Sequence, residues 1–262
     1  GYEGSAPVRI GNGAAEQYQA DVVGEVLLAL GAARDAGLEE SAFSWPLERA
    51  LLAHVAEQLD RPDNGIWEIR GEPRKFTHSR VMLWVAFDRA VQAVHEHGLD
   101  GPVERWERIR AELEAEIDAQ GYDAERGHFV QSYGTSEVDA ALLVLPQVGF
   151  CAPDDPRMLG TVAEIERTLM ADGLVHRYRT TTGVDGLAGH EHPFLACSFW
   201  LVVQYAASGR LADATALMDR LCGFANDVGM LSEEYDVHAH RHAGSTPQAL
   251  SHLALVPAAE AI

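Results

Sequence analysis

The length of the connections between helical segments is the feature that most constrains the fold of this chain. Connections such as Gln120 to Thr135 and Ala171 to His192 are long and polar, and each precedes a segment that is apolar nearly all round. Gly98 to Gly101 and Ser208-Gly209 are short, and each precedes a segment with one apolar stripe. A helix that is apolar all round must be buried, whereas a helix with one stripe lies at the surface. The alternation therefore predicts an inner and an outer ring of helices, with the long loops gathered at one end.

The spacing of apolar residues predicts about nine helices. They cover Ala14 to Ala33, Ser44 to Leu59, Phe76 to His97, Pro102 to Asp118, Ser136 to Leu145, Pro156 to Met170, Phe194 to Ala207, Arg210 to Ala225, and Thr246 to Ile262. The odd-numbered ones would form the inner ring and the even-numbered ones the outer ring. Stacked helical repeats would give similar pairs, but the period is irregular and the pairs share no signature. We therefore favour a closed or partly closed all-α toroid.

The charge of the chain limits its partners. Forty acidic against twenty basic residues give a net charge of −20, a field that repels nucleic acid and anionic membrane surfaces. The longest apolar run, Phe194 to Val203, is too short to cross a bilayer. We expect neither nucleic acid nor membrane as a partner, and a small neutral saccharide is compatible with the charge.

The cysteines and the first residues bear on compartment and domain organisation. Cys151, Cys197 and Cys222 are far apart and form no CxxC pair, so we expect free thiols and a cytoplasmic protein. The chain opens with GYEGSAPVRIG, without a Met or a signal peptide. This opening is typical of the middle of a longer protein.

The loop from Asp63 to Ser79 contains a candidate general acid. Trp67-Glu68 lies between Gly65 and Gly71, so the backbone can turn sharply on either side. An indole beside a carboxyl group disfavours its charged form by desolvation, which suits a proton donor. Glu68 is therefore the candidate acid. Alternatively, Trp67 anchors the loop in the core and Glu68 caps the following helix.

A second carboxylate is needed if Glu68 donates a proton to a glycoside. The last long connection contains Ser232-Glu233-Glu234-Tyr235-Asp236. Adjacent carboxylates repel, so one of the two should be held by a hydrogen bond or a cation, and Tyr235 is a candidate donor. A solvated acidic turn or a helix N-terminus is the structural alternative.

These two segments resemble the paired acid and base segments of glycoside hydrolase family 15, which contains glucoamylases, bacterial α-glucosidases and trehalases. The resemblance covers essentially the whole chain. It is also carried by Gly11 to Glu25, Asp63 to Ala90, Phe129 to Gly134, and Pro247 to Leu255. It implies an (α/α)6 barrel, in agreement with the two predicted rings, and hydrolysis of α-linked glucose with inversion and without a cofactor.

The resemblance also implies roles for single residues. Glu68 would be the general acid and Glu233 the general base, with Glu234 as the less favoured base and a substrate contact. Trp67 would form an aromatic wall of the glucose pocket. Arg177 and Tyr178 correspond to an Arg-Tyr pair at the glucose subsite, where a planar guanidinium can donate paired hydrogen bonds to vicinal hydroxyls.

Other residues have weaker support. Phe194 stands where fungal members carry a tryptophan, so a core role is as well supported as sugar stacking. His238, His240 and His242 alternate along the chain, but a flexible loop fits this pattern better than a metal site. We therefore expect no metal.

We expect a single catalytic domain over residues 1–262 that hydrolyses α-glucosidic bonds in the manner of a glucoamylase. Trehalose hydrolysis by the same residues is the alternative, and a carbohydrate-binding remnant without turnover is a second one. An (α/α)6 barrel has twelve helices, so the helix count predicts an incomplete ring that lacks its N-terminal part. Such a chain should be weakly stable or inactive alone, and its exposed flanks should drive formation of a homo-oligomer.

Overall fold

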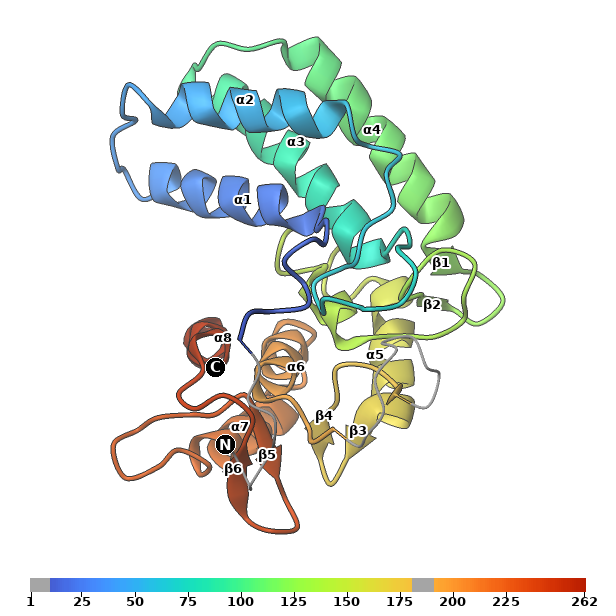
Figure 1. The fold of residues 1–262 in the computed structure, drawn as a ribbon, viewed down its shortest axis with the longest axis vertical. Helices are drawn as coiled ribbons and strands as arrows, with labels where there is room; N and C mark the ends of the chain where they lie inside the picture. The colour runs from blue at the N-terminus through green and yellow to red at the C-terminus, as the bar shows by residue number, and fades with distance from the viewer. Residues whose placement is uncertain (1–9, 181–190) are drawn as a thin grey trace.

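The computed structural model describes residues 10–180 and 191–262, which form an arc of helices with short hairpins at its edge (Figure 1). The helices are α1 (Asp21–Asp35), α2 (Ser44–Ala56), α3 (Thr77–His97), α4 (Val103–Gln120), the 3-10 helix η2 (Ala140–Val144), α5 (Pro156–Leu169), α6 (Leu195–Ala207), α7 (Leu211–Cys222) and α8 (Ala249–Glu260). The predicted all-α class is confirmed. In the described part of the chain no helix is both long and apolar enough to cross a bilayer.

The predicted difference between inner and outer helices is found where the sequence pattern is strongest. Every residue from Thr77 to Asp88 of α3 is buried, whereas α4 buries one stripe that includes Trp106 and Ile117. The helix α6 is likewise buried from Leu195 to Val202. The helix α1 lies close against α3, because a Cβ atom at Gly24 would be 2.1 Å from the carbonyl oxygen of Met82.

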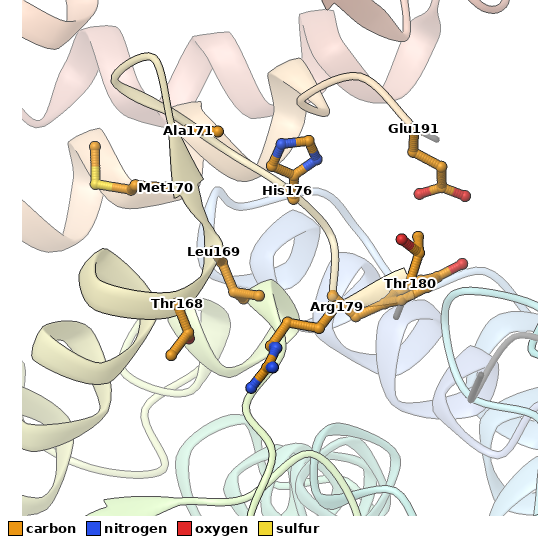
Figure 2. Close-up of a pocket in the computed structure, with 9 residues that line it drawn as sticks. Thr168, Leu169, Met170, Ala171, His176, Arg179, Thr180 and Glu191 are labelled. Atoms are coloured by element: carbon orange, nitrogen blue, oxygen red, sulfur yellow. The ribbon is translucent and has the colours of Figure 1, made fainter. Parts of the chain in front are cut away.

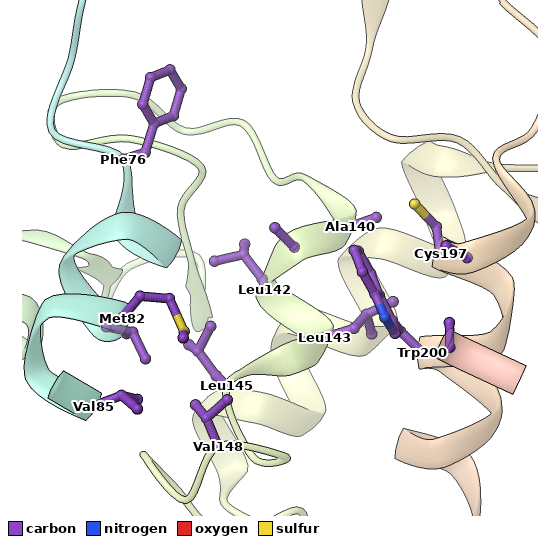
Figure 3. Close-up of a cluster of buried hydrophobic side chains, with 14 of the residues drawn as sticks. Phe76, Met82, Val85, Ala140, Leu142, Leu143, Leu145, Val148, Cys197 and Trp200 are labelled. Atoms are coloured by element: carbon purple, nitrogen blue, oxygen red, sulfur yellow. The ribbon is translucent and has the colours of Figure 1, made fainter. Parts of the chain in front are cut away.

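The 3-10 helix η2 forms the centre of the core between α3 and α6. Leu142 and Leu143 are fully buried. Figure 3 shows Met82 of α3 on one side of η2 and Trp200 of α6 on the other. These contacts join the two halves of the arc.

The first and last helices face a large cavity. It has a volume of about 720 Å³ and is lined by residues of both α1 and α8. Its walls include Leu28 and Val203, and the buried polar residues Asp21 and His78 also border it. On α8, Leu253 is 68% exposed. The arc is therefore open between α1 and α8.

Two helix predictions are wrong. The helix predicted from Ala14 begins at Asp21, because the preceding segment folds onto the Asp63 to Ser79 loop, where the Gln17 side chain donates to the carbonyl oxygen of Ile69 at 3.0 Å. The segment from Ser136 to Leu145 forms only η2. The Glu137 carbonyl and the Ala140 N–H bond to Gln131 and Arg177 in other loops, so they are not available to a longer helix.

Within the described residues, the long connections contain three antiparallel hairpins that were not predicted from the sequence. They are formed by β1 (Tyr122–Asp123) with β2 (His128–Phe129), β3 (Met170–Ala171) with β4 (Leu174–Val175), and β5 (Glu234–Asp236) with β6 (Arg241–Ala243). Strands of two or three residues are too short to show an alternating pattern. Part of the predicted connection from Ala171 to His192, residues 181–190, lies outside the described residues.

Candidate active site

The loop that carries Glu68 is anchored by a buried carboxylate. Asp63 Oδ2 accepts hydrogen bonds from Ser79 Oγ at 2.7 Å and from the backbone N–H of Ala20 at 3.1 Å. These bonds tie the loop to the starts of α3 and α1. Asp63 and Arg74 also exchange two backbone bonds of 2.9 Å, so the loop is closed at its base.

Trp67 and Glu68 point in different directions. The Trp67 side chain is buried, and its Nε1–H donates to Asp139 Oδ2 at 3.1 Å. Glu68 has a φ of +53°, in the left-handed region, and is exposed to solvent. Its Oε2 accepts from Asn12 Nδ2 at 3.3 Å. The expectation that Trp67 shields the Glu68 carboxyl from water is therefore wrong, because the turn sends the indole into the core and the carboxylate outward.

The helix-cap alternative for Glu68 is also excluded by position. The N-cap of α3 is Phe76, well beyond Glu68 in the chain. The part of the alternative that concerns Trp67 is correct, because this ring packs against Phe194 and Trp200 with centroid distances of 5.9 Å each. Trp67 thus both anchors the loop and borders the cavity described below.

Glu233 is held by the backbone of a neighbouring loop. Its Oε2 accepts from the Ser245 N–H at 2.9 Å, and its own N–H donates to the Ser245 carbonyl at 2.9 Å. The Glu233 carbonyl accepts from the N–H of Leu195 at 3.0 Å, which ties it to the first turn of α6. Gly244 has a φ of +69°, and a Cβ atom there would be 2.7 Å from Glu233 Oε2. The loop therefore requires glycine at this position.

Glu234 lies in a different environment from Glu233. Its Oε2 accepts from the His192 N–H at 3.3 Å. Burial, together with the nearby carboxylate of Glu191, raises the pKa of Glu234 to about 7, although Arg177 opposes the shift. The expectation that at least one of the two adjacent carboxylates is held by a hydrogen bond is met by both, through the N–H groups of Ser245 and His192. The ring of Tyr235, the donor predicted from the sequence, stacks on Phe224 with a centroid distance of 3.9 Å.

Arg177 is fixed by an ion pair and by aromatic rings. It forms a two-point contact with the carboxylate of Glu191. Its Cζ lies 5.8 Å from the ring centroid of Trp67 and 5.4 Å from that of Phe194. Glu191, which lies 14 residues after Arg177 in the same long connection, was not predicted from the sequence.

One cavity brings together four of the six residues predicted for the site. Its volume is about 250 Å³. It is lined by Ile66, Trp67, Glu68, Arg177, Phe194, Glu233, Gln248 and Leu250. Glu68 and Glu233 thus border one space although they come from loops far apart in the chain. Gln248, the N-cap of α8, and Leu250 were not foreseen.

A second cavity, shown in Figure 2, is lined in part by Glu191, the ion-pair partner of Arg177. Its volume is about 310 Å³, and burial lowers the pKa of His176, one of its lining residues. Tyr178 borders this second cavity rather than the one with Glu68 and Glu233. Because neither of these two carboxylates lines it, we assign no chemistry to it.

The histidines near the C-terminus lie apart from these cavities. His242 Nε2 bonds to the carbonyl oxygen of Phe224 at 2.6 Å, and His238 Nε2 lies 3.6 Å from a carboxylate oxygen of Asp172. Within residues 10–180 and 191–262 there is no group of three or more His, Cys, Asp or Glu side chains that could hold a metal ion.

Comparison with known proteins gives the family. Residues 1–216 match the family model described as Glycosyl hydrolases family 15. A trehalase of Thermoplasma volcanium is 39% identical over 257 residues, which are 98% of this chain and 41% of that protein. A trehalase of Mycobacterium tuberculosis is 40% identical over 258 residues, 98% of this chain and 38% of that protein. The chain spans about two fifths of the length of these curated relatives.

Solved structures support the fold. A glycosidase in complex with glucose has a TM-score of 0.76 at 22% identity and covers 94% of this chain and 67% of its own. A bacterial glucoamylase complexed with acarbose has a TM-score of 0.72 at 17% identity, covering 91% of this chain and 40% of its own. The family model shows that the chain belongs to glycosyl hydrolase family 15, and these structures show that its helices follow part of the same helical fold.

Proposed function

We propose that this chain carries the acid and base of an inverting glycoside hydrolase whose substrate is α,α-trehalose. The observation that carries the proposal is the shared cavity of Glu68 and Glu233, two carboxylates from distant loops, beside the fixed guanidinium of Arg177. The identity of 39–40% to curated trehalases favours trehalose over maltooligosaccharides. Glucoamylase-like hydrolysis of maltooligosaccharides remains the second candidate, supported by the fold shared with a glucoamylase.

In this mechanism Glu68 donates its proton to the glycosidic oxygen as the bond from that oxygen to C1 breaks. Glu233 accepts a proton from a water molecule, whose oxygen attacks C1 from the opposite face. Inversion requires room for this water, so we expect the carboxyl groups to stand about 6.5–9.5 Å apart. The bond from Ser245 to Glu233 Oε2 would orient the carboxylate so that Oε1 takes the water.

The remaining lining residues would bind the sugar. We assign Arg177 to the sugar hydroxyls, because its ion pair with Glu191 and its contacts with Trp67 hold the guanidinium plane in place. Trp67 and Phe194 would provide apolar walls. Tyr178 and Glu234 do not line this cavity and would act through Arg177. Tyr178 contacts the guanidinium with its ring, and the carboxyl group of Glu234 interacts with the charge of Arg177.

The test is glucose release from trehalose, maltose and maltotriose with one preparation, followed by NMR of the products. With inversion, trehalose gives one β-glucose and one α-glucose per turnover, because only the attacked ring inverts. Initial formation of α-glucose alone would refute inversion. Release of glucose from maltooligosaccharides and not from trehalose would favour the second candidate. Sugar binding without any turnover would favour a carbohydrate-binding remnant.

The domain organisation and the compartment of the protein are further proposals. We infer that the chain forms part of one catalytic domain whose ring is closed by further helices at the cavity between α1 and α8. We also infer a reducing compartment, the cytoplasm, from the three free cysteines.

A further inference from the structure

Asp139 is a buried carboxylate that the proposed reaction does not use. The residue is 3% exposed, and Oδ1 forms no hydrogen bond of good geometry among the described residues, although the backbone N–H groups of Ala141 and Leu142 lie near the carboxylate. Oδ2 accepts from Trp67 Nε1 at 3.1 Å and from Gln131 Nε2 at 3.4 Å. Burial of a carboxyl group is costly unless hydrogen bonds compensate it, and here it raises the pKa of Asp139 to about 7. An apolar side chain would fill the same space at a lower cost.

The hydrogen bond from Trp67 fixes the orientation of its indole ring, which the contacts with neighbouring rings do not determine. The indole touches Tyr178, Phe194 and Trp200, with centroid distances of 6.4, 5.9 and 5.9 Å. Apolar contacts of this kind have little directional preference, and the indole has a single polar atom, Nε1–H, which can only donate. The bond to Asp139 therefore determines how the ring is oriented beside the cavity.

The orientation of Trp67 also affects Glu68. On the far side of Glu68, two hydrogen bonds with Asn64 fix the buried residue Ile69. The Ile69 N–H donates to the Asn64 carbonyl oxygen at 3.0 Å, and Asn64 Nδ2 donates to the Ile69 carbonyl oxygen at 2.9 Å. Trp67 fixes the near side. Because Glu68 has a φ of +53°, its carboxylate direction depends on both neighbours being held in place.

We propose that Asp139 is a positioning residue that acts through the indole N–H of Trp67 to set the cavity wall and the direction of Glu68. The inference rests on the proposed function, since Glu68 is an acid only in that reaction. Asp139 comes from the segment before η2, so the acid loop is aligned by an element at the centre of the core.

The test is a double-mutant cycle in the full chain. Asp139→Asn keeps the size of the side chain but replaces one carboxyl oxygen with an NH2 group that cannot accept the Trp67 N–H, leaving one weaker acceptor. Trp67→Phe removes the N–H donor while keeping a ring. Each should lower kcat on trehalose by about 3- to 10-fold, the usual effect of one hydrogen bond between uncharged groups, with a smaller change in KM. The kcat of the double variant should be no lower than that of the less active single variant. Losses that multiply would overturn the proposal.

A control separates positioning from stability. Glu48→Gln removes another buried carboxylate. Glu48 lies on α2, outside the cavity, and pairs with Arg34 of α1 at 2.7 Å. It should lower Tm and leave kcat unchanged. If Glu48→Gln lowers kcat as much as Asp139→Asn does, the effect of Asp139 is general and the proposal fails.

NMR gives a readout that does not need turnover. Asp139→Asn should shift the indole N–H resonance of Trp67, assigned with Trp67→Phe, and the backbone N–H resonance of Glu68. If Asp139→Asn does not fold, Asp139→Ser, which also lacks the carboxyl group, carries the test through the same two resonances. A chain that hydrolyses no α-glucoside would refute the proposed function alone, whereas unmoved resonances would refute the positioning role.

Discussion

Replacement of Gly244 by alanine should misalign the general base without changing Glu233 itself. The added Cβ would lie 2.7 Å from Glu233 Oε2 and 3.0 Å from Glu233 Cβ, so the Glu233 side chain must rotate. Rotation breaks the 2.9 Å bond from Ser245 N–H to Oε2. A displacement of about 1 Å in a reacting group can cost about 100-fold in rate. We therefore expect Gly244→Ala to lower kcat on trehalose by about that factor.

The same substitution also strains the backbone, and the chain provides a matched control for this effect. Gly229 has a φ of +78°, close to the +69° of Gly244, but its added Cβ would meet nothing within 4 Å. Left-handed geometry costs a non-glycine residue about 1–2 kcal/mol. At roughly 2–4 °C per kcal/mol for a domain of this size, each variant should lose about 2–8 °C in Tm.

The assay compares the two variants by glucose release and thermal melting. Both should melt lower by similar amounts, and only Gly244→Ala should lose kcat. Equal kcat values for Gly244→Ala and Gly229→Ala would show that the Glu233 carboxylate does not depend on this backbone contact. The assignment of Glu233 as an aligned general base would then be refuted.

Three further predictions concern the acid, the buried carboxylate and the open side of the arc. Glu68→Gln and Glu233→Gln should each lower kcat by about 10²–10⁴-fold, and Glu234→Gln should lower it less; a larger loss in Glu234→Gln would exchange the roles of the two residues. The pKa of Asp139 is raised to about 7 from 3.8, so between these values the folded state keeps a proton that the unfolded state releases, and stability falls as the pH rises. Urea unfolding should show wild type losing free energy of unfolding relative to Asp139→Asn between about pH 4 and 7, and a difference that does not change with pH would contradict the shift. Leu253 on α8 is 68% exposed beside the cavity and Leu211 on α7 is 50% exposed away from it, so light scattering should show that Leu253→Glu reduces self-association more than Leu211→Glu does; a monomeric wild-type chain would contradict this.

The sequence predicted helices well where the apolar pattern alone decides burial. The helices α3, α4, α6 and α7 begin and end within a few residues of their predicted bounds, because a continuous or striped apolar pattern leaves few alternatives. The pattern from Ser136 to Leu145 is equally apolar, yet it forms only η2. Its backbone bonds to Gln131 and Arg177 belong to pairings between distant loops, which local periodicity does not record.

The site residues that could be predicted are those whose side-chain type and local sequence already indicate a catalytic role. Glu68 and Glu233 stand out as carboxylates in compact loop segments, and both line the 250 Å³ cavity. Glu191 and Gln248 have no such signal, because their roles follow from what lies beside them after folding. Asp139 did carry a signal, since it is the one charged residue in VDAALLVL. An isolated acid in an apolar run is costly to bury, and this cost points to a specific partner.

The backbone at Glu68 shows why a motif reading can identify a residue and still misjudge its environment. Trp67 and Ile69 are 7% and 2% exposed, while Glu68 between them is exposed. A sharp left-handed turn at a non-glycine residue costs free energy and persists only where the surrounding structure determines it. Here the bonds of Trp67 with Asp139 and of Ile69 with Asn64 supply that determination. Adjacency in sequence indicated that the indole would cover the carboxylate, but the same adjacency, with both neighbours fixed in the core, directs the carboxylate outward.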